Sequence, residues 1–253
     1  MAVFALLLAA SAAALRVASL NLCSDEYALL LARPGEVVSV TRLSHDREES
    51  VLAGRTHEIA TNRGRIEDVI AQRPTLLLTM GGGGGRSSGA IARSMGMRVL
   101  DLPQPAKLDE VAANLVQVAT ALGDAHRADF LVMQLAALRR TVPRRSIDTI
   151  WLGGGGLSLS STGLGAQWLA LAGFRQRALR AGRASLETLV TSPPKLLIQS
   201  HYRSGQMSQV QRWLDHPLIS RLPSRRVSTD GRRWTCAGPL LIEEVARLRR
   251  AAP

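Results

Sequence analysis

Aromatic and cationic side chains in loop-like segments are the groups of this chain best suited to hold a ligand. Trp234 and Tyr202 offer flat faces to a large planar or chelated ligand. Basic side chains in comparable segments could pair with ligand carboxylates or phosphates, and these are His45, Arg86, Arg203 and Arg232. Each arginine is equally well interpreted as a solvated loop residue, and a lone loop histidine is more often no ligand. These residues are the candidate ligand contacts.

The two cysteines, Cys23 and Cys236, lie in loop-like segments of different halves of the chain. In an oxidising compartment they would form a disulfide if their Cα atoms lie within about 7 Å. They could equally remain two buried thiols. A third possibility, less favoured than the disulfide or the two buried thiols, is contact with the metal of a bound ligand. For this reason Cys23 is also a candidate ligand contact. Two cysteines without clustered histidines do not form a zinc site, so we expect no metal centre of the protein's own.

The sequence carries no complete catalytic signature. Ser161, His201 and Asp230 are residue types found in hydrolases, yet no G-x-S-x-G elbow or H-E-x-x-H pair frames them. The glycine run 81–85 is close to a phosphate-binding loop, but its spacing fails and no lysine follows. The histidines are too dispersed for a dedicated metal-ion site, lying at positions 45, 57, 126, 201 and 216. We expect no catalytic residue, no intrinsic cofactor and no enzyme activity.

The net charge of +12 also has a simple interpretation. The chain holds 32 Lys and Arg against 20 Asp and Glu, and the arginines occur in every segment rather than in one tail or stripe. Aromatic residues make up only 4% of the sequence, too few for a platform that stacks single-stranded bases. The pattern favours a solvated basic surface, and no nucleic-acid partner is expected.

The first fourteen residues are typical of a signal peptide. Residues 1–14 carry no charge, contain the apolar run 4–8 and end in small residues that fit an A-x-A cleavage signal. No Lys or Arg precedes the run, so the first helix of a cytosolic protein is the alternative. Small residues do not precede Cys23, so there is no lipobox, and no apolar run is long enough to span a bilayer. We expect an exported protein without a lipid anchor.

Strand-like and helix-like segments alternate along most of the chain. Strands are expected at 16–20, 36–41, 75–79, 98–102, 149–152 and 196–199. Helices are expected at 26–32, 66–71, 90–95, 108–122, 125–142 and 167–172. This alternation predicts an α/β fold with mostly parallel sheets covered on both faces. A ligand would then meet the loops beyond the carboxyl ends of the strands, which are 21–25, 44–47, 80–86, 153–161, 200–203 and 232–236.

A short pattern occurs twice, 120 residues apart. Glu67 opens a short helix that Pro74 ends, and the apolar run 76–78 follows; Glu187, Pro194 and the run 196–198 repeat the arrangement. Two copies at corresponding places indicate two related lobes. We expect an N-terminal lobe at 15–123, a connecting helix at 124–145 and a C-terminal lobe at 146–253.

Together these features resemble the substrate-binding proteins of ABC importers for ferric siderophores, haem and cobalamin. The resemblance covers nearly the whole mature chain. It is carried by residues 16–26 (RVASLNLCSDE), by the two repeats at 67–78 and 187–198, and by residues 234–239 (WTCAGP). The family implies two Rossmann-like lobes joined by a single long helix, with the ligand in the cleft between them.

The resemblance also implies a function and its partners. The protein would capture a metal chelate (a ferric siderophore or a cobalamin-like corrinoid) in the periplasm as a monomer. Glu67 and Glu187 would dock the loaded protein onto arginines of the membrane permease, although both carboxylates also suit their helix starts. A Zn or Mn receptor, or a haem receptor, of the same architecture is the alternative.

Overall fold

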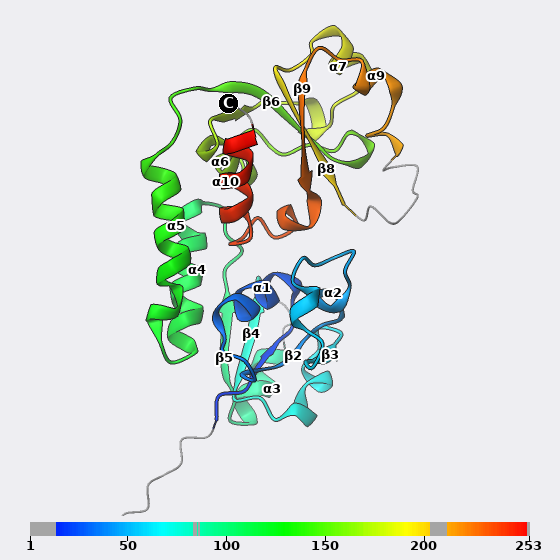
Figure 1. The fold of residues 1–253 in the computed structure, drawn as a ribbon. Coiled ribbons are helices and arrows are strands. Elements are labelled where there is room, and N and C mark those ends of the chain that lie inside the picture. Colours follow the sequence, from blue (N-terminus) through cyan, green and yellow to red (C-terminus); the bar gives the residue numbers. More distant parts are fainter. Residues whose placement is uncertain (1–13, 83–84, 86, 203–211, 252–253) are drawn as a thin grey trace, which may run out of the picture.

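The computed structural model describes residues 14–82, 85, 87–202 and 212–251, which form two lobes, each built on a parallel sheet (Figure 1). The strand order is β3-β2-β1-β4-β5 in the N-terminal lobe and β7-β6-β8-β9 in the C-terminal lobe. The predicted fold class, α/β with two parallel-sheet lobes, is therefore confirmed. The expected signal peptide, Arg86 and Arg203 lie outside the described residues, except that Ala14 is described.

The N-terminal lobe follows from buried apolar strands and a well-capped first helix. Its strands are β1 (Val17–Ser19), β2 (Val37–Thr41), β3 (Ala60–Asn62), β4 (Leu76–Met80) and β5 (Arg98–Leu102). Every residue of β1 and β4 is buried, as expected for central parallel strands covered on both faces. Helices α1 (Leu22–Leu31), α2 (Arg42–His45) and α3 (Ser88–Ser94) complete the lobe. The Asn21 side chain accepts hydrogen bonds from the N–H groups of Cys23 and Ser24, so α1 begins there.

The C-terminal lobe repeats this plan. Its strands are β6 (Ile147–Leu152), β7 (Phe174–Gln176), β8 (Leu196–His201) and β9 (Arg225–Asp230). Its helices are α6 (Leu164–Leu171), α7 (Leu186–Thr191), α9 (Pro217–Ser220) and α10 (Leu241–Ala251). Strand β8 pairs with β6 in parallel as β4 pairs with β1, so the repeated sequence pattern leads into equivalent strands of the two sheets.

The connection between the lobes is helical. Helix α5 (Asp129–Arg140) lies in the segment expected to connect them, and α4 (Leu108–Ala121) runs beside it (Figure 1). Gly123, with φ +86°, makes the tight reversal between the two helices, and the Asp124 carboxylate caps the short 3-10 turn that leads into α5. The lobes are therefore joined by a packed helical hairpin, which resists wide opening better than a single strand of chain would.

The largest apolar cluster extends through both lobes and the hairpin, and one smaller cluster lies within each lobe. The largest cluster contains Leu78 of β4, Leu115 of α4, Leu135 of α5, Trp168 of α6 and Leu241 of α10. Burial of each such side chain contributes about 2 kcal/mol. Because this cluster includes residues of both lobes, apolar packing connects them in addition to the chain itself.

Three strands (β3, β7 and β9) and three helices (α2, α9 and α10) were not predicted from the sequence. Strands β3 and β7 have three residues each, and β9 begins with Arg225 and Arg226, so none shows a long apolar run. Helix α10 packs on β9, α5 and α6. Within the described ranges, no helix has the length and apolar character needed to cross a membrane.

Candidate ligand-binding site

A pocket of about 500 Å³ opens between the two lobes. The N-terminal lobe contributes Arg47 and Glu48, which follow α2. The remaining lining residues come from the ends of β8 and β9, from the 3-10 turn Gly231–Trp234 and from α10: His201, Ser228, Thr229, Asp230, Arg232, Arg233, Glu244 and Arg247. The pocket thus lies at the carboxyl ends of the C-terminal strands, where open α/β sheets bind their ligands.

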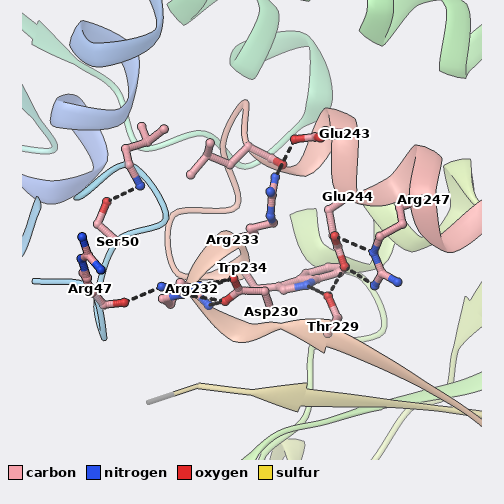
Figure 2. Close-up of polar contacts among 12 residues, drawn as sticks. Arg47, Ser50, Thr229, Asp230, Arg232, Arg233, Trp234, Glu243, Glu244 and Arg247 are labelled. Carbon is pink, nitrogen blue, oxygen red and sulfur yellow. Dashed lines mark hydrogen bonds and ion pairs between the residues drawn. The ribbon is translucent and has the colours of Figure 1, made fainter. Parts of the chain in front are cut away.

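The pocket wall is dominated by arginine–carboxylate pairs (Figure 2). Arg232 contacts Asp230 at 2.6 Å, and Arg247 contacts Glu244 at 2.6 Å. Burial acts to raise the pKa of Asp230, but the hydrogen bonds from Arg232 outweigh it and hold that pKa below its usual value. The same pairing raises the pKa of Arg232. The site therefore presents fixed, fully charged guanidinium groups, which suit carboxylate or phosphate groups of a ligand.

Two hydrogen bonds join the lobes beside this pocket. The Arg232 guanidinium donates to the backbone carbonyl of Arg47, as Figure 2 shows. The Tyr202 hydroxyl donates to the carboxylate of Glu49. Both contacts link the segment after α2 to the segments that follow β8 and β9. The two lobes are therefore in contact beside the pocket.

Cys23 and Cys236 form a disulfide, with their Cα atoms 5.3 Å apart. Cys23 lies in the first turn of α1, and Cys236 lies between β9 and α10. The sequence left a disulfide, two buried thiols and contact with a ligand metal as alternatives. The structure shows the disulfide, which cross-links the two lobes. Because the bond uses both sulfur atoms, Cys23 has no thiolate to offer a ligand metal.

Trp234 lies in the core and not on the pocket wall, contrary to the sequence-based expectation. Its side chain is only 7% exposed, its ring centroid lies 5.7 Å from that of Trp151, and its N–H donates to the Thr229 hydroxyl at 2.8 Å. The hydroxyl of Thr229 in turn donates to Glu244. Trp234 thus supports the Glu244–Arg247 pair from behind, because a buried indole N–H needs a partner and Thr229 supplies it.

The other sequence-based candidates are spread around the cleft. Arg232 lines the pocket, and Tyr202 bridges the lobes. His45 ends α2, where its Nδ1 lies 3.2 Å from the Thr56 hydroxyl, and it is not part of the pocket lining. Among the residues that the structure describes, no three His, Cys, Asp or Glu side chains converge to hold a metal ion.

Most of the charged side chains that line the pocket were not predicted from the sequence. Arg47 lies in an expected loop but was not singled out, and Arg233, Glu244 and Arg247 were not considered. The spacing of Glu244 and Arg247 places them on one face of a helix, which was the available signal. This spacing would have pointed to the pocket only if helix α10 and its packing on β9 had also been predicted.

A buried acidic pair lies where α1 meets the C-terminal lobe. Asp25 accepts hydrogen bonds from the Thr41 hydroxyl at 2.5 Å and the Ser44 hydroxyl at 2.6 Å, yet burial raises its pKa to about 6. Burial, and then the charge of Asp25, raise the pKa of Glu26, whose Oε2 has no hydrogen-bond partner among the described residues. A Cβ added to Gly238 of the other lobe would lie 3.3 Å from this oxygen. Glu26 therefore lies directly at the contact between the lobes.

This pair predicts that stability falls as the pH rises. The folded state holds the Asp25 proton up to about pH 6, whereas the unfolded chain releases it near 3.8. The protonated Asp25 therefore stabilises the fold fully at a pH below its pKa in the unfolded chain. This stabilisation is lost as the pH rises through its pKa in the folded protein, a change of about 3 kcal/mol in the free energy of unfolding. Unfolding by denaturant at about pH 4 and about pH 7 measures this loss.

Matched variants identify the groups responsible. Glu26→Gln is expected to be more stable than the wild type at neutral pH and to have a shallower pH slope, because it replaces a carboxyl whose ionised form is disfavoured by burial with an amide that does not ionise. Glu58→Gln, a change at an exposed carboxylate, should keep the wild-type slope. An unchanged slope in both Glu26→Gln and Asp25→Asn would contradict the assignment.

Glu67 and Glu187 are exposed and occupy corresponding places in the two lobes. Glu67 lies in the 3-10 turn Ile66–Asp68 that precedes β4, and Glu187 lies in the first turn of α7, which precedes β8. Because β4 and β8 are equivalent strands, the two carboxylates are related by the internal repeat.

The architecture has counterparts among solved structures, whereas no protein-family model and no curated protein matches the chain. A periplasmic heme-binding protein from Pseudomonas aeruginosa is 21% identical, with a TM-score of 0.64 over 93% of this chain and 91% of the other. The periplasmic heme-binding protein HutB of Vibrio cholerae is 18% identical, with a TM-score of 0.70 over 94% and 99%. The vitamin B12-binding protein BtuF of Vibrio cholerae is 18% identical, with a TM-score of 0.63 over 94% and 97%. The chain therefore has the two-lobed fold of the periplasmic binding proteins for heme and vitamin B12.

Proposed function

We propose that the chain is the periplasmic substrate-binding component of an ABC importer and captures a metal chelate between its lobes. The observation that carries this proposal is the pocket between the lobes, with Arg47 on one side and three arginines on the other. The shared fold with heme- and vitamin B12-binding proteins supports it. The volume of about 500 Å³ lies within the usual range for small-molecule sites.

The charge of the pocket favours a chelate with anionic groups. Guanidinium groups bind carboxylates and phosphates through paired hydrogen bonds, and heme and many siderophores carry carboxylates. A free metal ion would instead need several converging His, Cys, Asp or Glu side chains, and the described part of the chain has no such group. We therefore prefer a chelate to a bare ion as the ligand.

Capture would take place with little movement of the lobes. The ligand anion would compete with the Arg47 carbonyl and with Asp230 for the Arg232 guanidinium. The largest apolar cluster and the disulfide Cys23–Cys236 oppose wide opening. The loaded protein would then dock on the permease through Glu67 and Glu187, one exposed carboxylate on each lobe.

Titration of the purified protein with heme, cobalamin and a panel of ferric siderophores tests the proposal. Quenching of tryptophan fluorescence that saturates at micromolar ligand or below is the expected result. Failure to respond to every chelate, together with a response to a free Zn or Mn ion, would contradict it and favour a metal-ion receptor.

Arg232→Gln is expected to weaken binding of the responding chelate by about 10-fold to 100-fold, because a charge-assisted hydrogen bond is lost. The matched control is Arg180→Gln, an exposed arginine of the same lobe outside the pocket, which should leave the affinity unchanged. Equal affinity for Arg232→Gln and the wild type would remove Arg232 from the ligand site.

A further inference from the structure

The whole net charge of the protein resides in its C-terminal half. Residues 1–123 hold twelve Lys and Arg and twelve Asp and Glu, and so have no net charge. Residues 124–253 hold twenty Lys and Arg against eight Asp and Glu, which accounts for the full +12. Binding of a small chelate in the cleft does not require so large a difference in net charge between the two halves of the chain.

The excess cations gather at the amino ends of the C-terminal strands. Five segments meet there, and we call them the basic pole: residues 140–148, 173–177, 193–196, 220–226 and 249–251. Arg145 donates to the carbonyl of Arg249 at 3.0 Å, Arg225 to that of Ala251 at 2.6 Å, and Arg177 to that of Ser192 at 2.5 Å. These contacts join the end of α10 to the segments at the starts of β6 and β9, and the segment after β7 to the segment before β8.

The basic pole holds eleven Lys and Arg and one acidic residue, Asp148. Asp148 is already paired with Arg175 and Arg177. Burial lowers the pKa of Arg249, and the nearby charge of Arg145 lowers it further. The positive charge of this surface is therefore largely uncompensated within the described protein.

Four of these cations are exposed and form no polar side-chain contact with the described residues: Arg140, Arg144, Lys195 and Arg250. They come from the end of α5, the loop before β6, the residue before β8 and the last turn of α10. Side chains from four separate elements thus face solvent around one end of the sheet, and their guanidinium and ammonium groups are available to a partner.

The basic pole is remote from the ligand cleft. Strands β8 and β9 point toward the N-terminal lobe and end at the pocket with His201 and Asp230, whereas the basic pole surrounds their starts (Figure 1). A partner bound at the basic pole would therefore leave the cleft open. The four-stranded sheet is about 14 Å across at this end, which gives a surface for several anionic groups rather than a pocket for one.

We propose that the basic pole binds the surface of a bilayer that contains anionic phospholipids. Arginine pairs with phosphate through two parallel hydrogen bonds, and a polybasic surface is attracted by the negative potential of anionic headgroups. The only aromatic residue in the basic pole is the buried Phe174, so the surface cannot stack nucleic-acid bases. Attachment through exposed charges alone makes the binding peripheral and sensitive to salt.

Sedimentation with vesicles tests this proposal. The full chain should bind vesicles of equal parts phosphatidylcholine and phosphatidylglycerol at low salt, release them at high salt, and ignore vesicles of phosphatidylcholine alone. A variant that loses four charges of the basic pole should bind the anionic vesicles about a thousandfold more weakly at low salt. It carries Arg140→Gln, Arg144→Gln, Lys195→Gln and Arg250→Gln.

A matched control removes the same charge from the N-terminal lobe. It carries four changes at exposed positions, Arg63→Gln, Arg65→Gln, Arg93→Gln and Lys107→Gln, and should bind like the wild type. Equal losses in both variants would show that net charge alone matters and would overturn the proposal. Stronger binding to a DNA duplex than to the anionic vesicles would overturn it as well. Chelate titration should be unchanged in the pole variant, which separates this proposal from the function of the cleft.

Discussion

Replacing Cys23 and Cys236 together by alanine is expected to lower the free energy of unfolding by about 4 kcal/mol. The disulfide spans 213 positions of the chain, and closing so long a loop removes much of the conformational entropy of the unfolded state. It also joins α1 to the segment before α10, and so restrains the two lobes near the cleft. Denaturant unfolding under oxidising conditions measures the loss.

Reduction of the wild-type protein separates the cross-link from packing. Cys236 is buried, so its replacement also removes packed atoms, whereas a reductant breaks the bond and leaves both side chains in place. The reduced wild type should therefore lose nearly as much stability as the double variant. A loss below about 1 kcal/mol in both would contradict a stabilising role for the bond.

The double change Glu67→Ala and Glu187→Ala is expected to abolish transport and to leave the affinity for the chelate unchanged. The two carboxylates are exposed, lie at equivalent positions of the two lobes and are not part of the pocket lining. Held on one rigid body, they would form a two-point contact with a symmetric permease. Uptake of the chelate by cells that express the chain and its permease, with affinity measured on the purified protein, checks both parts.

The control for this experiment is the pair Glu58→Ala and Asp215→Ala. It removes the same charge from exposed sites, one on each lobe, and should transport like the wild type. Normal uptake by the Glu67/Glu187 variant, or loss of its chelate affinity, would show that these residues are not the docking carboxylates.

The sequence predicted the fold well because burial dictates it. Strands such as Leu76–Met80 are apolar throughout, and helices such as Leu108–Ala121 repeat their apolar residues with helical spacing, so local pattern and tertiary position agree. The pattern fails for β7 and β9. These strands are short or begin with arginines that reach solvent, and they are strands only because β6 and β8 provide partners.

The site was harder to predict because it depends on the directions of side chains in loops and on contacts between distant segments. Arg232 lines the pocket, as its place in an expected cleft loop suggested. Trp234, two residues later, points into the core, because it packs against Trp151 and donates a hydrogen bond to Thr229. Arg47 and Arg247 are two hundred positions apart, and only the packing of the lobes brings them to the same pocket. The periodicity of apolar residues does not predict the direction of the Trp234 side chain or the approach of Arg47 to Arg247.

The disulfide between the lobes has a consequence for the lifetime of the protein in a compartment that contains proteases. The bond turns the chain from Cys23 to Cys236 into a covalent ring that includes both sheets and the helical hairpin. A single peptide-bond cut within this ring leaves one molecule with two new ends, whose fragments stay joined and share the largest apolar cluster. A nicked copy could therefore keep its cleft assembled, and two cuts in different loops would be needed to release a piece of the structure.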